Sequence, residues 1–242
     1  MRRDNDLITD WIAAQKSDGE YGAYHPKEAG TAGYIPKGSF FLDGIICEDK
    51  YNQAKRKVLY IAKECHTWEY DKANAEADDL EPQHFFVRDE LNAGHSDNRF
   101  LKGLAMLQNA IQNNDYSTPD KSISSLSEAA FINLNKRGGY RRCIWTTLEG
   151  YVKRYARFIR RQIEEIDPDI IVCCGEGVRA LVKEYHLADR CRDIRCAYHP
   201  SCFFVSDREK LRFLGSQNGN CLDKETVEED QTAGKPIDRR GR

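Results

Sequence analysis

The sequence predicts an α/β fold with three layers, in which a central, mostly parallel, four-stranded sheet lies between helices. Short apolar runs rich in β-branched residues are typical of strands that are buried on both faces. Stretches with helical apolar spacing alternate with these runs, and such alternation favours parallel strands joined by crossover helices. The four expected strands are residues 58–62, 129–135, 169–174 and 194–197.

Composition divides the chain into three parts. Residues 1–54 are expected to form an N-terminal helix, over residues 6–16, and an irregular segment that covers part of the core. Residues 55–215 contain all four strands, whereas residues 216–242 form a polar tail that we expect to be mobile. With 40% hydrophobic residues, the chain has enough apolar surface for the core of one large domain.

Four further helices are expected around the sheet, because apolar residues recur there at helical spacing. They cover residues 98–112, 151–166, 178–185 and 207–214, and Pro168 ends the second of them. Two other segments lack such a period. Residues 69–97 are acid-rich and indicate a long surface excursion, and residues 136–142 indicate a basic loop hinged on glycines.

Cysteine usage and hydropathy narrow the class of protein. The nine cysteines form no Cys-x-x-Cys pair, which favours reduced thiols over a disulfide scaffold or a zinc site, so we expect no metal and no cofactor. No apolar run approaches the ~20 residues of a membrane span, and no signal-type segment follows Met1. We therefore expect a soluble, cytoplasmic protein without a membrane partner, and nothing indicates an obligate protein partner.

Polar residues follow three of the expected strands. Glu64, Asn133 and His199 each lie at or just after a strand end. Ligands of open α/β sheets bind beyond the carboxyl ends of the strands, so these three side chains are expected to converge at one edge. His199 opens a His-Pro-Ser turn, in which Pro200 fixes the backbone and makes the histidine project from a stiff position.

With these residues in place, the chain resembles the uracil-DNA glycosylase superfamily over roughly residues 55–215. The helix and strand of residues 158–175 and the turn of residues 199–201 carry the most specific likeness, and they look most like the branch with an iron-sulfur cluster. The cysteines that would hold that cluster are missing. The first motif also departs from the family pattern, because residues 62–66 lack its glycine and proline.

The resemblance implies hydrolysis of an N-glycosidic bond in DNA. Glu64 would stabilise the sugar and orient water, or it forms a salt bridge with Lys63 or a loop arginine. His199 would stabilise the leaving base oxygen, or it only stabilises its turn. Asn133 would contact the edge of a flipped pyrimidine, or it caps the following loop.

The resemblance also implies groups that flip and hold the base. Phe85 or Phe86 would stack on it, and Phe203 would enter the duplex, although buried phenylalanines are also common in cores. Ser201 belongs to the same turn as His199 and is a further substrate-binding candidate. His66 follows the proposed carboxylate where many relatives have small residues, which suggests a pocket shaped for a larger base.

A basic stripe supplies the expected DNA footprint. Between residues 136 and 161 there are nine basic residues and one acid, in a chain whose net charge is −2. The stripe is either a phosphate contact or a solvated helix face. The candidate DNA-binding residues within it are Lys136, Arg137, Arg141, Arg142 and Arg157.

The sequence therefore predicts a monofunctional DNA glycosylase that acts on uracil or a modified pyrimidine, in DNA repair or in antiviral defence. A bulky modified cytosine, as in some phage DNA, is one candidate base. Two alternatives stay open: an inactive DNA-binding module on the same fold, and a hydrolase of free nucleotides or nucleosides.

Overall fold

The computed structural model describes residues 3–18, 40–66, 85–139 and 143–217. Its centre is a five-stranded sheet with the order β1-β3-β2-β4-β5. Strands β2 (Val58–His66), β3 (Ala129–Gly139), β4 (Ile170–Cys174) and β5 (Asp193–Ala197) run parallel. These are the four strands predicted from the sequence. The fifth, β1 (Gly44–Ile45), pairs antiparallel with β3 and is too short to carry a sequence pattern.

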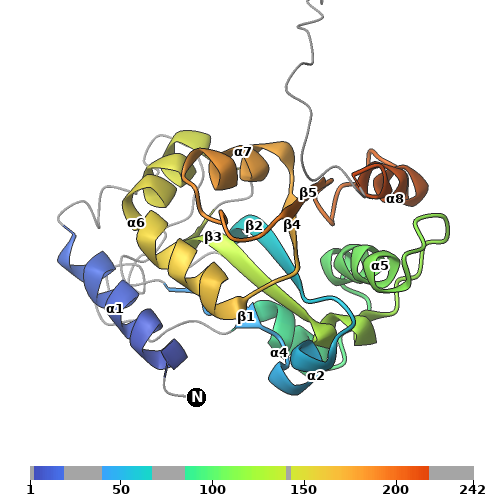
Figure 1. Ribbon diagram of the computed structural model, residues 1–242, viewed down its shortest axis with the longest axis horizontal. Helices are drawn as coiled ribbons and strands as arrows, with labels where there is room; N and C mark the ends of the chain where they lie inside the picture. The colour runs from blue at the N-terminus through green and yellow to red at the C-terminus, as the bar shows by residue number, and fades with distance from the viewer. Residues whose placement is uncertain (1–2, 19–39, 67–84, 140–142, 218–242) are drawn as a thin grey trace, which may run out of the picture.

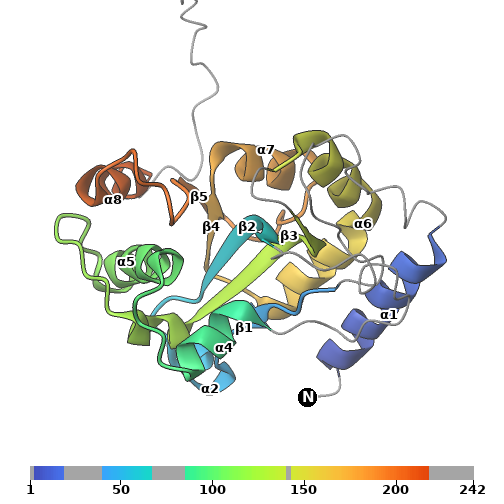
Figure 2. The same cartoon turned by 180° about the vertical axis from the view of Figure 1, so that it is seen from behind.

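Helices cover both faces of the sheet, as Figures 1 and 2 show from opposite sides. One face carries α1 (Arg3–Ser17), α6 (Trp145–Ile166) and α7 (Glu176–Glu184). The other carries α4 (Phe86–Asn92), α5 (Arg99–Asn113) and α8 (Asp207–Gly215), with the 3-10 helix η1 (Ile123–Glu128) leading into β3. The α/β fold with three layers is therefore confirmed, with five strands rather than four. None of the helices in the described ranges is long and apolar enough to cross a bilayer.

The segment before β2 closes the outer edge of β3. The Phe41 N–H donates to the Lys136 carbonyl (2.7 Å), and the Ile46 N–H donates to the Ala129 carbonyl (3.1 Å), on either side of the β1 pairing. An uncovered edge strand would present its polar backbone to other chains. Helix α2 (Glu48–Gln53) then leads into β2 at the amino end of the sheet. This segment is the covering element that the sequence could not place in detail.

Helix α1 packs on α6 through an aromatic cluster. Trp11 is buried, its ring stacks on Phe158 with centroids 5.5 Å apart, and Phe40 meets it edge-on at 5.6 Å. The Tyr151 hydroxyl donates to Gln15 Oε1 (2.9 Å) along the same contact. The N-terminal helix is thus part of one core with the sheet.

Several element boundaries differ from the sequence prediction. Helix α6 starts at Trp145, six residues before the expected start at residue 151, and it ends at Asp167 in a left-handed conformation (φ 49°) just before Pro168. Strand β3 runs on to Gly139, through residues that were predicted to form a loop. Part of the expected surface excursion is also helical, because α4 lies within it and buries Val87.

Candidate active site at the carboxyl edge of the sheet

The chain leaves β2 toward the face of α4 and α5, whereas it leaves β3 and β4 toward the face of α6 and α7. At such a reversal the loops separate, and ligands of open α/β sheets bind there. Glu64 lies near the end of β2 and His199 lies two residues after β5, whereas Asn133 lies within β3, where it pairs with Ala62 of β2. Glu64 and His199 therefore lie at the expected edge of the sheet.

The turn that carries His199 is held by close packing. Pro200 is buried against Gly103 of α5, where a Cβ atom would lie 2.3 Å from the Pro200 carbonyl oxygen. The Cys202 N–H donates to the His199 carbonyl (2.8 Å), which closes the turn. Only glycine at position 103 lets α5 approach this backbone so closely. The histidine therefore projects from a rigid base.

The imidazole of His199 is kept neutral with a fixed tautomer. Its Nδ1 accepts a hydrogen bond from the Ser201 N–H (3.3 Å), which leaves the proton of the neutral ring on Nε2. Burial, together with the charges of Lys63 and Lys210, lowers the pKa of His199 to about 4. The ring of Phe100 covers it at a centroid distance of 5.7 Å. At neutral pH His199 is thus a hydrogen-bond donor, not a cation.

The carboxylate of Glu64 lies against the backbone of β3. A Cβ atom at Gly139 would lie 2.1 Å from Glu64 Cγ, so the side chain occupies the space that this glycine leaves. Cys143 Sγ donates to Glu64 Oε2 (3.5 Å). Burial raises the pKa of Glu64, while Lys63 and the Cys143 thiol oppose that shift. Partly desolvated carboxylates of this kind are typical of general bases.

Lys63 links the two groups electrostatically. Its charge lowers the pKa of both Glu64 and His199. The same ammonium lies over the ring of Trp145 at 6.0 Å. Trp145 in turn packs on Gly177, where a Cβ atom would lie 2.4 Å from its ring. These contacts join the first residue of α6 to the site.

Asn133 is buried on the α5 face of β3, two residues after Phe131. Phe131 contacts Phe100 edge-on at 5.6 Å, and Phe100 contacts His199, so one row of aromatic contacts connects the two polar residues. No residue in the described ranges forms a hydrogen bond with the Asn133 carboxamide. Its amide oxygen and nitrogen can therefore form hydrogen bonds with water or with a ligand.

A buried ion pair clamps the backbone of Asn133. The Asp43 carboxylate accepts from the Asn133 N–H (2.8 Å), and Lys136 Nζ donates to the Asn133 carbonyl (2.8 Å) and to both Asp43 oxygens (2.6 and 2.7 Å). Gln162 Nε2 also donates to Asp43 Oδ1 (2.8 Å). Asp43 directly precedes β1, so this clamp extends the pairing of β3 with the segment that carries β1.

This clamp corrects the expected DNA footprint. Lys136 and Arg137 belong to β3 and are 1% and 2% exposed, so neither side chain lies on a surface that DNA would contact. The residues were predicted to form a loop because they are basic and two glycines follow them. Asp43 supplies the counter-charge that allows the Lys136 ammonium to be buried. Arg141 and Arg142 lie outside the described residues.

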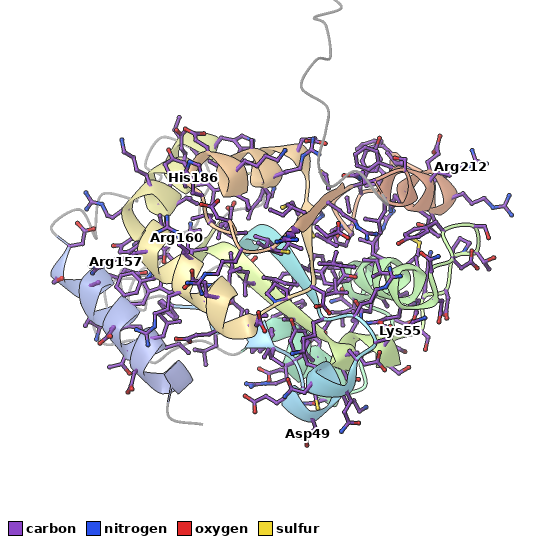
Figure 3. The ribbon with its side chains drawn as sticks, in the orientation of Figure 1. Asp49, Lys55, Arg157, Arg160, His186 and Arg212 are labelled. Carbon is purple, nitrogen blue, oxygen red and sulfur yellow. The ribbon has the colours of Figure 1, made fainter. Side chains whose placement is uncertain are left out.

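Three other basic residues of the stripe have partners within the protein. Arg154 pairs with Asp18, Arg160 donates to the carbonyls of Tyr185 and His186, and Arg161 pairs with Glu165. Lys153 and Arg157 remain exposed. Figure 3 shows Arg157 and Arg160 along α6, on the side of the molecule where α1 lies. The stripe is therefore mostly a helix face with internal partners.

The aromatic candidates separate into two groups. Phe85 is buried in the core, and Phe86 is exposed on α4, beside α2 at the amino end of the sheet (Figures 1 and 2). The structure does not bring this pair to the edge with Glu64. Phe203 is exposed four residues after His199. His66 ends β2 but its side chain lies outside the described part, and Ser201 contributes its backbone N–H to His199.

Sequence reasoning missed Asp43, Gly103, Gly139 and Cys143. Two adjacent glycines, at positions 138 and 139, were the one available signal, since glycine in a strand often marks a close approach. Within the described ranges no group of three or more His, Cys, Asp or Glu side chains could hold a metal ion. No protein-family model, curated protein or solved structure matches the chain.

Proposed function

We propose that the protein is a monofunctional DNA glycosylase that hydrolyses the N-glycosidic bond of uracil or a modified pyrimidine. The observation that carries the proposal is His199, a neutral imidazole with Nδ1 occupied and Nε2–H available, at the same sheet edge as the desolvated carboxylate of Glu64. Both groups act on the same edge, and both feel the charge of Lys63. A carboxyl group with a raised pKa and an imidazole with a lowered pKa, as in Glu64 and His199, suit a reaction that separates charge.

The chemistry follows from the two groups. As the bond between the sugar and the base breaks, its electron pair leaves with the base, and the sugar carbon becomes positive. Glu64 stabilises that positive charge and accepts a proton from the attacking water. The Nε2–H of His199 donates a hydrogen bond to the base oxygen on which negative charge develops. The free carboxamide of Asn133 contacts the edge of the base.

An excision assay tests the proposal. The full chain is incubated with DNAs that contain uracil, other damaged pyrimidines or modified cytosines, and products are scored by cleavage at abasic sites and by the mass of the released base. Glu64→Gln and His199→Ala should each reduce excision at least ~100-fold. Glu48→Gln and His186→Ala change exposed residues away from the edge and serve as matched controls. Full activity in both site variants would overturn the assignment.

One observation favours a second candidate, the hydrolysis of free nucleotides or nucleosides. Among the described arginines of the basic stripe, Arg154, Arg160 and Arg161 already have partners within the protein, so the footprint on a phosphate backbone is smaller than expected. A small-molecule enzyme would release base from free deoxynucleosides or nucleotides and would ignore DNA. Release from DNA alone supports the glycosylase. Binding of DNA without release of any base points instead to an inactive module.

A further inference from the structure

Four exposed aromatic rings come from segments that carry or contact the candidate site residues. Phe203 and Phe204 are 63% and 84% exposed, Trp145 is 47% exposed and Tyr198 is 39% exposed. Single exposed rings are common on protein surfaces, but a group of four at one edge indicates an interaction site. They come from both helical layers, because Trp145 begins α6 and the other three follow β5.

The rings of Phe203 and Phe204 lie against each other. Their ring centroids lie 3.8 Å apart with a 38° tilt, and the Arg99 guanidinium lies 5.3 Å from the centre of the Phe203 ring. The segment is anchored on one side by Pro200 against Gly103, and on the other by the capping box of Ser206 at the start of α8. Rings on an anchored segment lose little freedom on binding.

Among the described residues, the basic side chains of β3 and α6 do not form the footprint of a duplex. Proteins that hold a duplex neutralise many phosphates with lysine and arginine, yet Arg154, Arg160 and Arg161 have internal partners, and Lys136 and Arg137 are buried. Binding of single strands instead combines a few cations with aromatic rings on which successive bases stack. The edge offers Lys63 and Arg99, each beside an exposed ring.

We propose that Phe203 and Phe204, flanked by Arg99, are a stacking platform for unpaired bases, and that the protein binds single-stranded DNA in preference to duplex DNA. The same preference in excision rests on the proposed function, whereas the binding itself does not. A nucleotide in a single strand needs no unpairing before it enters the site, and its neighbours stack on the rings.

The test measures binding and excision separately. Fluorescence anisotropy follows a labelled single strand, and the same strand annealed to its complement, bound to the full chain with Glu64→Gln, which prevents turnover. The single strand should bind at least ~10-fold more tightly, with a shallow dependence on salt. Phe203→Ala and Phe204→Ala should each weaken binding of the single strand by ~5-fold or more. Phe86→Ala, which removes an exposed ring at the opposite end of the sheet, should leave it unchanged.

The outcomes distinguish the two proposals. Tighter binding of the duplex, or wild-type affinity in both platform variants, would overturn the platform. Thermal melting checks the fold of each variant, and because both rings are exposed their loss should not lower the melting temperature. Excision is then measured on the same two DNAs with the intact Glu64. Platform-dependent binding without excision overturns the glycosylase and leaves the platform. Excision together with wild-type affinity in both platform variants overturns the platform and leaves the glycosylase.

Discussion

Two pairs of a lysine and a carboxylate lie along β2 and β3, and they differ in how completely their charges are satisfied. Lys136 uses its ammonium on both oxygens of Asp43 and on a backbone carbonyl, in the dry core. Lys63 and Glu64 are sequence neighbours, but in the described ranges they form no ion pair. Lys63 lies over Trp145, and Glu64 accepts from a thiol, which is a weak donor.

The difference indicates what each pair does. A buried ion pair is tolerated only when nearly every donor and acceptor is matched, as for Lys136 and Asp43, and such a pair holds a structure in place. A carboxylate that is desolvated and poorly matched, as for Glu64, is costly for folding and is typical of a site that awaits a ligand. The first pair therefore fixes the frame, and under the proposed function the second would supply the reactive carboxylate.

The largest expected effect comes from breaking the first pair. Lys136→Met leaves Asp43 buried without its cation, so the free energy of unfolding should fall by about 3–5 kcal/mol, as measured by urea denaturation at neutral pH. Lys63→Met, the matched variant in the second pair, should change it by less than about 1 kcal/mol.

If Lys136→Met does not fold, two other variants keep the comparison testable. Asp43→Asn retains hydrogen-bonding groups beside Lys136, and the double variant Asp43→Leu with Lys136→Met removes both charges and should recover most of the lost stability. Equal stability of Lys136→Met and the wild type would mean that the pair does not support the strand.

A smaller effect is expected where Glu64 rests on β3. Gly139→Ala places a methyl group 2.1 Å from Glu64 Cγ, so the carboxylate must move, and excision should fall by about 100-fold. Gly215→Ala is the matched control, because its methyl group meets the Tyr116 ring at 2.8 Å, away from Glu64. If both variants lose the same activity, overcrowding alone explains the loss and Glu64 is not positioned by Gly139.

The sequence predicted the strands and most helices because their patterns are local. Apolar runs and helical spacing are read within a few residues, and parallel strands bring their carboxyl ends together whatever lies between them. Glu64 and His199 were found for that reason. The fold class and these two positions needed no knowledge of distant contacts.

The sequence could not reveal contacts between distant residues. Asp43 is separated from Lys136 by 93 positions, and nothing around either residue indicates the pairing. The partner of Arg154 is likewise Asp18 on the segment after α1, so a count of charges between residues 136 and 161 overstated the free positive charge. The pair of glycines was interpreted as a hinge because Glu64, which fills the space at Gly139, lies on another strand.

The pH dependence of stability separates His199 from ordinary histidines. Its pKa is about 4 in the folded chain against 6.5 for a free side chain, so the unfolded chain binds more protons between these values. Stability should therefore fall as pH drops from 6.5 to 4. Glu64, with its raised pKa, acts in the opposite direction, so the comparison needs a variant.

Urea denaturation at about pH 7 and about pH 4.5 isolates the histidine. His199→Asn should lose less stability on acidification than the wild type, because it has no ring that must stay neutral in a buried position. His186→Asn alters an exposed ring and should retain the wild-type pH dependence. Equal losses in wild type and His199→Asn would show that the folded chain does not hold this ring neutral.

The smallest expected effect concerns the thiol beside Glu64. Cys143 donates to the carboxylate and thereby lowers its pKa, so Cys143→Ala should raise the pKa of Glu64 further. Since the carboxylate is the active form, the acid limb of the kcat/KM profile for excision should move to higher pH, by less than about one unit. Cys143→Ser keeps a hydrogen-bond donor, so the acid limb of its profile should lie at the wild-type pH or lower. Cys47→Ala, at the amino end of the sheet, is the control. A merely structural thiol would lower activity equally at every pH, and that result would leave Glu64 without a partner that tunes it.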